Sequence, residues 1–291
     1  MNTRLIQEIA DAVLYEGYLL YPYRASAIKN RQRWNFGVLY PRAYAELQTG
    51  SDTWTMQTEC LLKARPKATP SIRTRFLRLL APAEKGQAQR AAPREVSFHG
   101  FSLLALANAT RRQRDIGVTV EAKAEQVSDN VFRLRVTVSN SARFNGSTRE
   151  EALARSLVST HIILGIDDGE FVSLLDPPDD LRDAAAACKN QGLWPVLVGE
   201  DGERDAMLAS PIILYDYPKI APESPGALFD GTEIDEILTL RILTMTDQEK
   251  AEMAQADERT REILRRTESM PPEQLMKLHG VLRDVRAKEA S

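Results

Sequence analysis

The chain contains few of the residues that usually perform catalysis or bind metals. Its 291 residues include only three histidines and two cysteines. Histidine is the commonest general base and metal ligand near neutral pH, and His99, His161 and His279 lie far from one another in the sequence. Cys60 and Cys188 lack the paired spacing of a zinc knuckle or a redox dithiol. We therefore expect reduced, buried thiols, and neither a metal nor a cofactor.

Long apolar runs and an excess of one charge are also missing. No stretch approaches the roughly 20 apolar residues that cross a bilayer, and the N-terminal sequence does not resemble an export signal. The 38 basic and 41 acidic residues leave a net charge of -3, which disfavours broad nucleic-acid binding. With 43% apolar residues, a chain of this length can bury a substantial core. We therefore predict a soluble cytoplasmic protein that does not enter a membrane.

Aromatic residues are concentrated near the N-terminus. Six of the eight tyrosines fall within the first 44 residues, interleaved with arginines and lysine. Protein interfaces are enriched in tyrosine, tryptophan and arginine, because these side chains give large contact areas with a polar tip. The pattern predicts a docking surface for a protein partner, with the candidate residues Tyr15, Tyr18, Tyr21, Tyr23, Arg24, Trp34, Phe36 and Tyr40. Two alternatives are packing of these rings onto the domain's own sheet and stacking on nucleic acid.

The middle of the chain alternates apolar and polar residues in the manner of antiparallel strands. Strands are predicted at residues 55–64, 72–80, 96–101, 159–166, 171–175, 194–198, 211–217 and 237–245, and a hairpin at 117–139 turns at Asp129-Asn130. Two more hairpins are predicted, one around the proline-containing residues 65–70 and one around Asp167-Asp168-Gly169. The pattern indicates an antiparallel sheet or sandwich-like core.

Helices are predicted at both ends of the chain. An amphipathic pattern covers residues 4–20. Two overlapping capping boxes, Ser147 with Glu150 and Thr148 with Glu151, predict the start of a helix in the middle of the chain. A short helix is predicted at 179–190. Charged and apolar periodicity predicts a helical extension at 246–291 that follows a mixed body at 1–245, and residues 83–94 are predicted to form a mobile loop. The predicted fold class is α+β, an antiparallel core with an N-terminal helix and a C-terminal helical extension.

Two other functions are compatible with the residues present. A metal-dependent or thiol enzyme could use His161, Cys188 and the acidic residues 230–236, provided that the fold brings them into one pocket. The sequence lacks the local signature of a thiol hydrolase. The last predicted helix carries an apolar stripe at Leu275, Leu278, Leu282 and Val285, which could pair with a second copy of the chain and so build a homo-oligomer or self-assembling structural module.

Two stretches resemble a known family. They are LYEGYLLYPYRASAIKN at residues 14–30 and, within 210–236, the more distinctive segments SPIILYDYP, IAPESPG and FDGTEIDE. They are similar to an uncharacterised bacterial family associated with the gene neighbourhoods of nickel-iron hydrogenases, and the likeness spans most of the chain. That family has no established catalytic residues. The resemblance implies a non-enzymatic accessory or assembly protein of a hydrogenase system, with a hydrogenase component as the protein partner.

Overall fold

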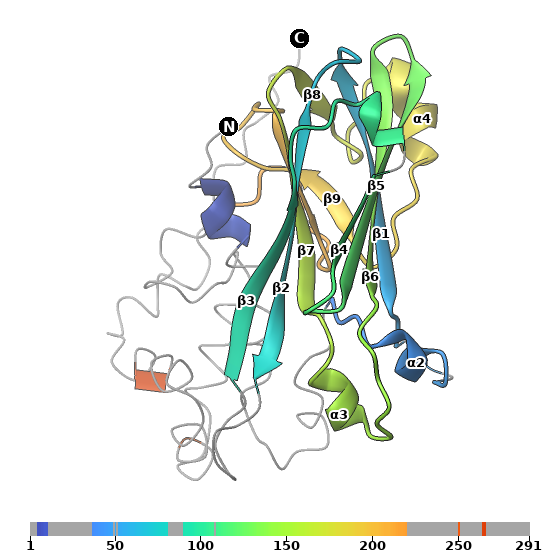
Figure 1. The fold of residues 1–291 in the computed structure, drawn as a ribbon. Helices are drawn as coiled ribbons and strands as arrows, with labels where there is room; N and C mark the ends of the chain where they lie inside the picture. Colours follow the sequence, from blue (N-terminus) through green and yellow to red (C-terminus); the bar gives the residue numbers. More distant parts are fainter. Residues whose placement is uncertain are drawn as a thin grey trace.

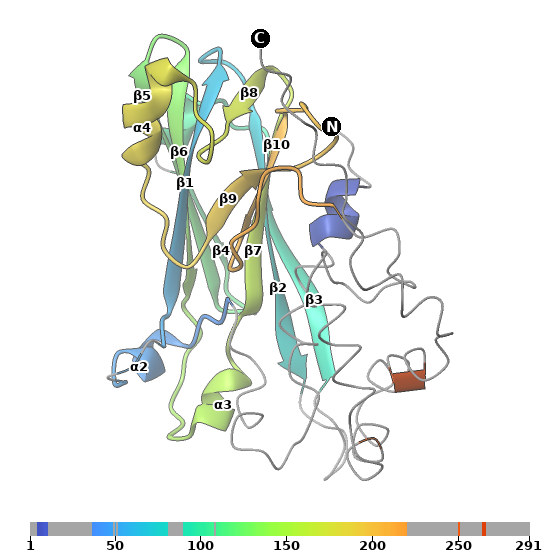
Figure 2. The ribbon, with the colours of Figure 1, turned by 180° about the vertical axis from the view of Figure 1, so that it is seen from behind.

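The computed structural model describes residues 5–10, 37–48, 50, 52–80, 90–107, 109–219, 250 and 264–265. These residues are mostly β, with a few short helices, and they build two five-stranded antiparallel sheets. The two sheets pack face to face, as the ribbon shows from both sides (Figures 1 and 2). The predicted antiparallel, sandwich-like core is therefore confirmed.

The sheet that contains β1 is named the β1 sheet, and the other is named the β2 sheet. In spatial order, the β1 sheet consists of β4 (Ala109–Gln113), β5 (Val118–Ser128), β6 (Val131–Asn140), β1 (Thr55–Ala64) and β8 (Gly169–Val172). The β2 sheet consists of β3 (Arg90–Phe98), β2 (Pro70–Leu80), β7 (Val158–Ile166), β10 (Ala206–Ser210) and β9 (Trp194–Leu197). Pro93 and Pro195 both lie in edge strands, where a missing N–H leaves the sheet ladder intact.

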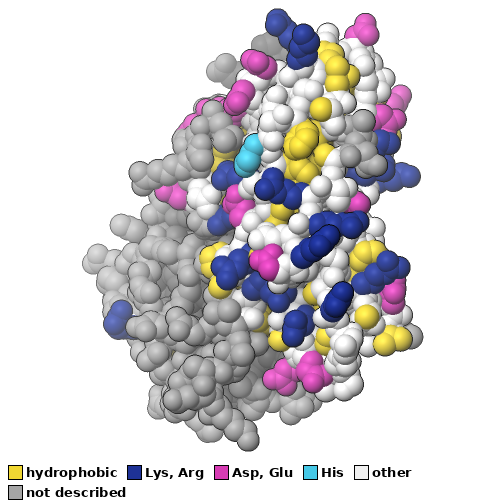
Figure 3. All heavy atoms as spheres, viewed as in Figure 1, with side chains coloured by type: hydrophobic (Ala, Val, Ile, Leu, Met, Phe, Trp, Pro, Cys, Tyr) yellow, Lys and Arg dark blue, Asp and Glu magenta, His cyan; other side chains and the backbone are white. Residues whose placement is uncertain are grey.

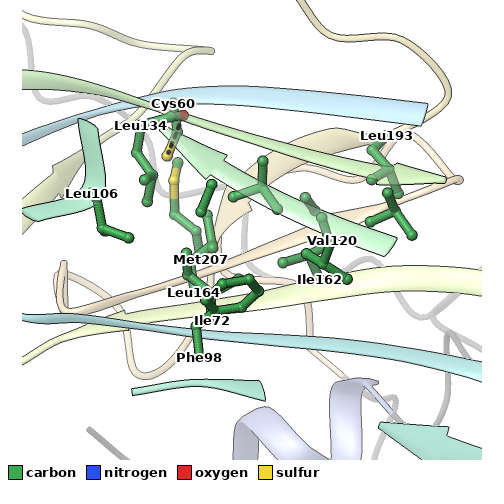
Figure 4. Packing of buried hydrophobic residues seen from close by; sticks show 14 of the residues in the cluster. Cys60, Ile72, Phe98, Leu106, Val120, Leu134, Ile162, Leu164, Leu193 and Met207 are labelled. Atoms are coloured by element: carbon green, nitrogen blue, oxygen red, sulfur yellow. Dashed lines mark hydrogen bonds between the residues drawn. The ribbon is translucent and has the colours of Figure 1, made fainter. Parts of the chain in front are cut away.

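The main core fills the space between the two sheets. Alternate residues of each strand point inward, so one cluster joins Cys60 and Leu134 of the β1 sheet to Ile72, Leu164 and Met207 of the β2 sheet (Figure 4). All five side chains are fully buried. Burying a large apolar side chain contributes roughly 1.5–3 kcal/mol relative to leaving it exposed. This interdigitated layer is the principal source of stability in the sandwich.

The β5–β6 hairpin agrees with the sequence prediction in both its strands and its turn. The strands pair antiparallel over almost their full length, from Val118 opposite Asn140 to Ser128 opposite Val131. Asn130 adopts a φ of 57°, and asparagine is one of the few residues that enter this left-handed region at low cost. Of the two overlapping capping boxes that the sequence predicts, the structure forms the one at Thr148 and Glu151. The Glu151 N–H donates to the Thr148 hydroxyl, and the Glu151 carboxylate accepts from the Thr148 N–H at the start of α3 (Arg149–Leu153).

The other two predicted hairpins are wrong. Strands β1 and β2 are joined by a tight turn but belong to different sheets, and β1 pairs with β6 and β8 instead. The Asp167-Asp168-Gly169 turn likewise takes the chain from β7 in the β2 sheet to β8 in the β1 sheet. Both turns therefore close one end of the sandwich. A short turn reverses the chain in either case, so turn residues alone do not distinguish a hairpin from a connection between sheets.

Two further predicted segments differ from the structure. Residues 90–94, placed in the mobile loop at 83–94, are part of β3 and pair with β2, so Arg94 lies opposite Phe76. Residues 83–89 lie outside the described part of the chain. The strand predicted at 211–217 is displaced, because β10 ends at Ser210. The inward-facing residues of β10, Met207 and Ala209, are less strongly apolar than the run at 212–214 that follows them. The sequence pattern therefore placed the strand too late in the chain.

The described helices are short and lie at the margins of the sandwich. Residues 5–10 are helical, and Ile6, Ile9 and Ala10 pack on the outer face of the β2 sheet against Val196 and Leu208. The other helical elements are α2 (Arg42–Ala45), η2 (Ala105–Ala107), η3 (Asp179–Leu181) and α4 (Arg182–Ala186). None of the described helices has the length and apolar character needed to span a membrane. The predicted C-terminal extension at 246–291 falls outside the described residues, apart from 250 and 264–265.

Candidate functional site

The most unusual surface feature is residues 211–217, named the edge segment, which follow β10 and run back along the free edge of β9. The Tyr217 N–H donates to the Leu197 carbonyl over 2.8 Å, and the Leu197 N–H donates to the Asp216 carboxylate over 2.8 Å. Among the described strands β9 is at the edge of its sheet, so the Leu197 N–H and carbonyl have no neighbouring strand to pair with there. The edge segment thus protects an edge that could otherwise pair with another chain.

Asp216 anchors the edge segment to both sheets. Its second carboxylate oxygen accepts a hydrogen bond from the Ser173 hydroxyl over 2.5 Å. Ser173 follows β8 in the β1 sheet, and its hydroxyl oxygen also accepts from the N–H groups of Leu175 and Asp176. The carboxylate therefore joins β9 in one sheet to the end of β8 in the other. Hydrogen bonds to a charged group are worth about 1.5–3 kcal/mol each, so this anchor fixes the backbone around it.

Tyr217 adopts a backbone conformation that costs free energy. Its φ is 56°, in the left-handed region that non-glycine residues seldom adopt. Burial raises the pKa of the Tyr217 phenol, the charge of Asp216 acts in the same direction, and Arg204 opposes them. Its ring packs partly buried against the main core. The surrounding bonds and contacts over-determine this conformation, as is common where a surface loop has a fixed shape.

The anchored backbone presents two large apolar side chains to solvent. Ile213 is 71% exposed and Tyr215 is 86% exposed, whereas Leu214 between them packs towards the N-terminal helix and the outer face of the β2 sheet. Trp194, at the start of β9, is 37% exposed. Tyrosine and tryptophan supply much of the binding energy at protein interfaces, because they bury large areas and lose little side-chain entropy. The edge segment is therefore a rigid platform that can contact another protein.

The sequence predicted an interface elsewhere, in the aromatic N-terminal region. Of the eight candidate residues, the structure describes only Tyr40; the others, Tyr15, Tyr18, Tyr21, Tyr23, Arg24, Trp34 and Phe36, lie outside the described residues. Tyr40 is 2% exposed, and its ring lies 5.3 Å from that of Tyr44. Its hydroxyl accepts a hydrogen bond from Arg149 over 2.7 Å. Tyr40 therefore packs within the domain, which was the alternative to a role in an interface.

The electrostatics of Tyr40 agree with this packing role. Burial raises the pKa of its phenol to about 12, with a further increase from Asp52 and an opposing effect of Arg149. Arg149 lies 5.1 Å from the centre of the ring and also donates to Asp52 over 2.8 Å. The arginine therefore links the start of α3 to the segment before β1. Tyr40 is a neutral structural group at any physiological pH.

His161 and Cys188, the pair that an enzyme would need, lie on opposite outer faces of the sandwich. His161 is fully buried in β7, on the same side as Ile163, which packs on the outer face of the β2 sheet. Its Nδ1 donates to the Ser159 carbonyl over 3.0 Å, since a carbonyl can only accept. Cys188 packs with Leu61 on the outer face of the β1 sheet. Both sheets stand between the two side chains, so they do not form a nucleophile and base.

The two thiols are also poorly suited to nucleophilic chemistry. Burial raises the pKa of both Cys60 and Cys188, and in Cys188 the neighbouring Arg133 only partly opposes this effect. A raised pKa lowers the thiolate fraction at neutral pH. Within the described residues, no three His, Cys, Asp or Glu side chains are grouped closely enough to hold a metal ion. The acidic residues 230–236 and the apolar stripe of the last predicted helix fall outside the described residues.

Sequence reasoning identified the edge segment but assigned it the wrong structure. Ile212, Ile213, Leu214 and Tyr215 form an apolar run that is typical of a strand. The missed signal was the proline at each end, Pro211 and Pro218, together with Asp216, which is depleted in strands. A scan against protein-family models finds no match to the chain, and a search of curated proteins finds no similar sequence.

Proposed function

We propose that this chain is a cytoplasmic, non-enzymatic accessory protein of a nickel-iron hydrogenase system that acts by contacting another protein. The observation that carries the proposal is the edge segment, where Ile213 and Tyr215 stand 71% and 86% exposed on a backbone fixed by Asp216. The same residues belong to SPIILYDYP, the stretch with the more distinctive family resemblance. One of the stretches that carry the resemblance therefore includes the residues proposed to make the contact.

The edge segment is held in place before binding, and this makes it better suited to binding than a flexible exposed loop. A surface that is ordered before binding loses less conformational entropy when the complex forms. A tyrosine at the centre of an interface typically contributes about 2 kcal/mol or more. The residues of the edge segment are therefore sufficient to make a contact with another protein. The N-terminal aromatic residues 15–36 remain a second candidate surface for the same partner.

Affinity purification from the source organism tests this proposal. The tagged full chain should recover hydrogenase components, and the double variant Ile213→Ser with Tyr215→Ser should recover at least about tenfold less, because two exposed contact residues are lost. Leu47→Ser is the matched control, since Leu47 is 81% exposed on a different part of the surface. We expect this control to recover as much as the unmodified chain.

Two outcomes would contradict the proposal at different levels. Recovery of no hydrogenase component by the unmodified chain would remove the hydrogenase context. Equal recovery by the double variant and the unmodified chain would move the contact away from the edge segment. Because both substituted side chains are exposed, unfolding is not expected to confuse the comparison, and thermal denaturation of the purified variant checks this directly.

A further inference from the structure

A second feature is a pocket of about 410 Å³. It is lined by the β4–β5 turn, the end of β2 and the segments that precede and follow α3, whose place in the fold is labelled in Figure 1. Its lining is dominated by four arginines. Arg78 comes from β2, Arg114 from the β4–β5 turn, Arg143 from the segment after β6, and Arg155 from the segment before β7. Four segments that are distant in the sequence therefore bring guanidinium groups to one place. We name it the arginine pocket.

One wall of the arginine pocket depends on a glycine. Gly117 has a φ of +73°, and a Cβ atom at this position would lie 2.5 Å from the Ala142 Cα, far closer than two carbon atoms can pack. The Gly117 carbonyl accepts from the Ser141 N–H over 2.7 Å, and its own N–H donates to Gln113 over 2.9 Å. The β4–β5 turn is thus pressed directly against the segment after β6. This wall is rigid backbone.

A buried asparagine also fixes backbone of the pocket lining. Asn140 is fully buried, and its side-chain amide donates to the carbonyls of Arg155 over 3.0 Å and Leu39 over 2.8 Å. Its side-chain oxygen accepts from the Ala142 N–H over 3.0 Å. Two of these three bonds, to Arg155 and Ala142, therefore hold backbone of the pocket lining. The arginine pocket is built into the fold by the core and does not depend on a loose loop.

Arg78 is the innermost of the four arginines. It follows Ile72 and Phe76 at even spacing along β2, so it faces the space between the sheets at their open end. Its guanidinium donates to the carbonyls of Arg155 over 2.8 Å and Ser156 over 3.4 Å. Burial lowers the pKa of Arg78, and the charges of Arg155 and Arg94 lower it further. Like charges are therefore concentrated here at an electrostatic cost.

The described residues around the pocket do not neutralise its positive charge. Among the described lining residues Asp115 is the one acidic side chain, so with the four arginines they carry a net charge of 4 − 1 = +3. Within the part of the chain that the structure describes, no ion pair joins any of the four to a carboxylate. Figure 3 shows Lys and Arg side chains gathered on the face that includes β3 and β4, with fewer acidic ones among them. A binding site for an anion explains this arrangement.

We propose that the arginine pocket binds a small molecule through a phosphate or diphosphate group. Arginine presents a planar fork of donors that matches the oxygens of phosphate, and several forks around one pocket can hold it from different sides. A phosphate carries about −1.5 to −2 charges at pH 7, so it offsets more of the local +3 than a single carboxylate does. The volume of the pocket lies in the range of about 300–1,000 Å³ that is usual for small-molecule sites.

Calorimetric titration of the full chain with inorganic pyrophosphate, at constant ionic strength, tests the proposal. Arg114→Gln and Arg143→Gln should each weaken binding about tenfold, because each removes one charge-assisted contact. Arg112→Gln is the matched control, since Arg112 is exposed on β4 but does not line the pocket. Asp115→Asn should tighten binding, because it removes the acidic side chain found among the described lining residues. This gain cannot result from unfolding.

Several results would overturn the proposal. Absence of pyrophosphate binding to the unmodified chain would do so, as would equal weakening by Arg112→Gln, which would indicate only diffuse surface charge. Citrate at the same ionic strength serves as the carboxylate comparison, and binding as tight as that of pyrophosphate would contradict the preference for phosphate. Single-stranded DNA that binds more tightly than pyrophosphate and loses affinity in the Arg112→Gln variant would point to a nucleic-acid surface instead.

Discussion

Replacing Asn140 with alanine should lower the free energy of unfolding by about 3 kcal/mol, because three hydrogen bonds of one buried side chain, one of them buried and two partly buried, are lost at once, at about 1 kcal/mol each. The partners left behind are the carbonyls of Leu39 and Arg155 and the N–H of Ala142. Asn140 is completely buried, so water cannot readily replace the lost side chain. Urea denaturation of the purified variant measures the effect.

Asn145→Ala is the matched control for this substitution. Asn145 is exposed in the segment after β6, and among the described residues its side chain has no hydrogen-bond partner. A surface substitution of this kind is expected to change stability by no more than about 0.5 kcal/mol. A loss below about 1 kcal/mol in the Asn140 variant would show that the end of the sandwich near α3 does not rely on this side chain. The rigidity claimed for the arginine pocket would then be unsupported.

The second large effect is expected at the edge segment, on changing Asp216 to alanine. The substitution removes the carboxylate that accepts from the Leu197 N–H and from the Ser173 hydroxyl. Bonds of this charge-assisted type contribute about 1.5–3 kcal/mol each, so the edge segment should detach locally from β9 before the sandwich unfolds. We expect hydrogen exchange at the Leu197 and Tyr217 amides to accelerate by at least about tenfold.

Two further variants separate the anchor from a general loss of charge. Asp216→Asn keeps an oxygen that can accept one of the two hydrogen bonds, so its exchange rates should lie between those of the parent chain and the alanine variant. Asp176→Ala removes a nearby exposed carboxylate that makes no side-chain hydrogen bond among the described residues. We expect it to leave exchange at Leu197 unchanged. Unaltered exchange in Asp216→Ala would mean that packing alone holds the edge segment.

The strands of this fold could be predicted from sequence more readily than their arrangement. The alternation of Val120 and Ala122, followed by that of Leu134 and Val136, identified two strands, and the residues of their turn identified the hairpin. The residues at 65–70 and at Asp167-Asp168-Gly169 are equally typical of turns, yet each joins the two sheets. What distinguishes these cases is the partner on which each strand's apolar face packs, and that depends on residues far away in the sequence.

The two surface sites differ in how visible they are in the sequence. Tyr215 and Ile213 lie in an apolar run that the resemblance also singled out, but their exposure follows from the bonds that Asp216 makes to distant elements. The arginine pocket gives no sequence signal at all, because Arg78, Arg114 and Arg155 are separated by tens of residues. The topology brings them together at one end of the sandwich. Tyr40 shows the converse, because its place in an aromatic cluster allowed either an interface or packing within the domain, and the side chain is buried.

The claim at the centre of this account is that the edge segment contacts another protein, and site-specific cross-linking tests it most directly. A photo-reactive phenylalanine analogue placed at position 215 in the source organism should form a covalent adduct with a hydrogenase component, since Tyr215 is 86% exposed. The same analogue at Leu47, which is 81% exposed on another part of the surface, should not form this adduct. An identical adduct pattern at both positions, or no protein adduct at position 215, would contradict the claim.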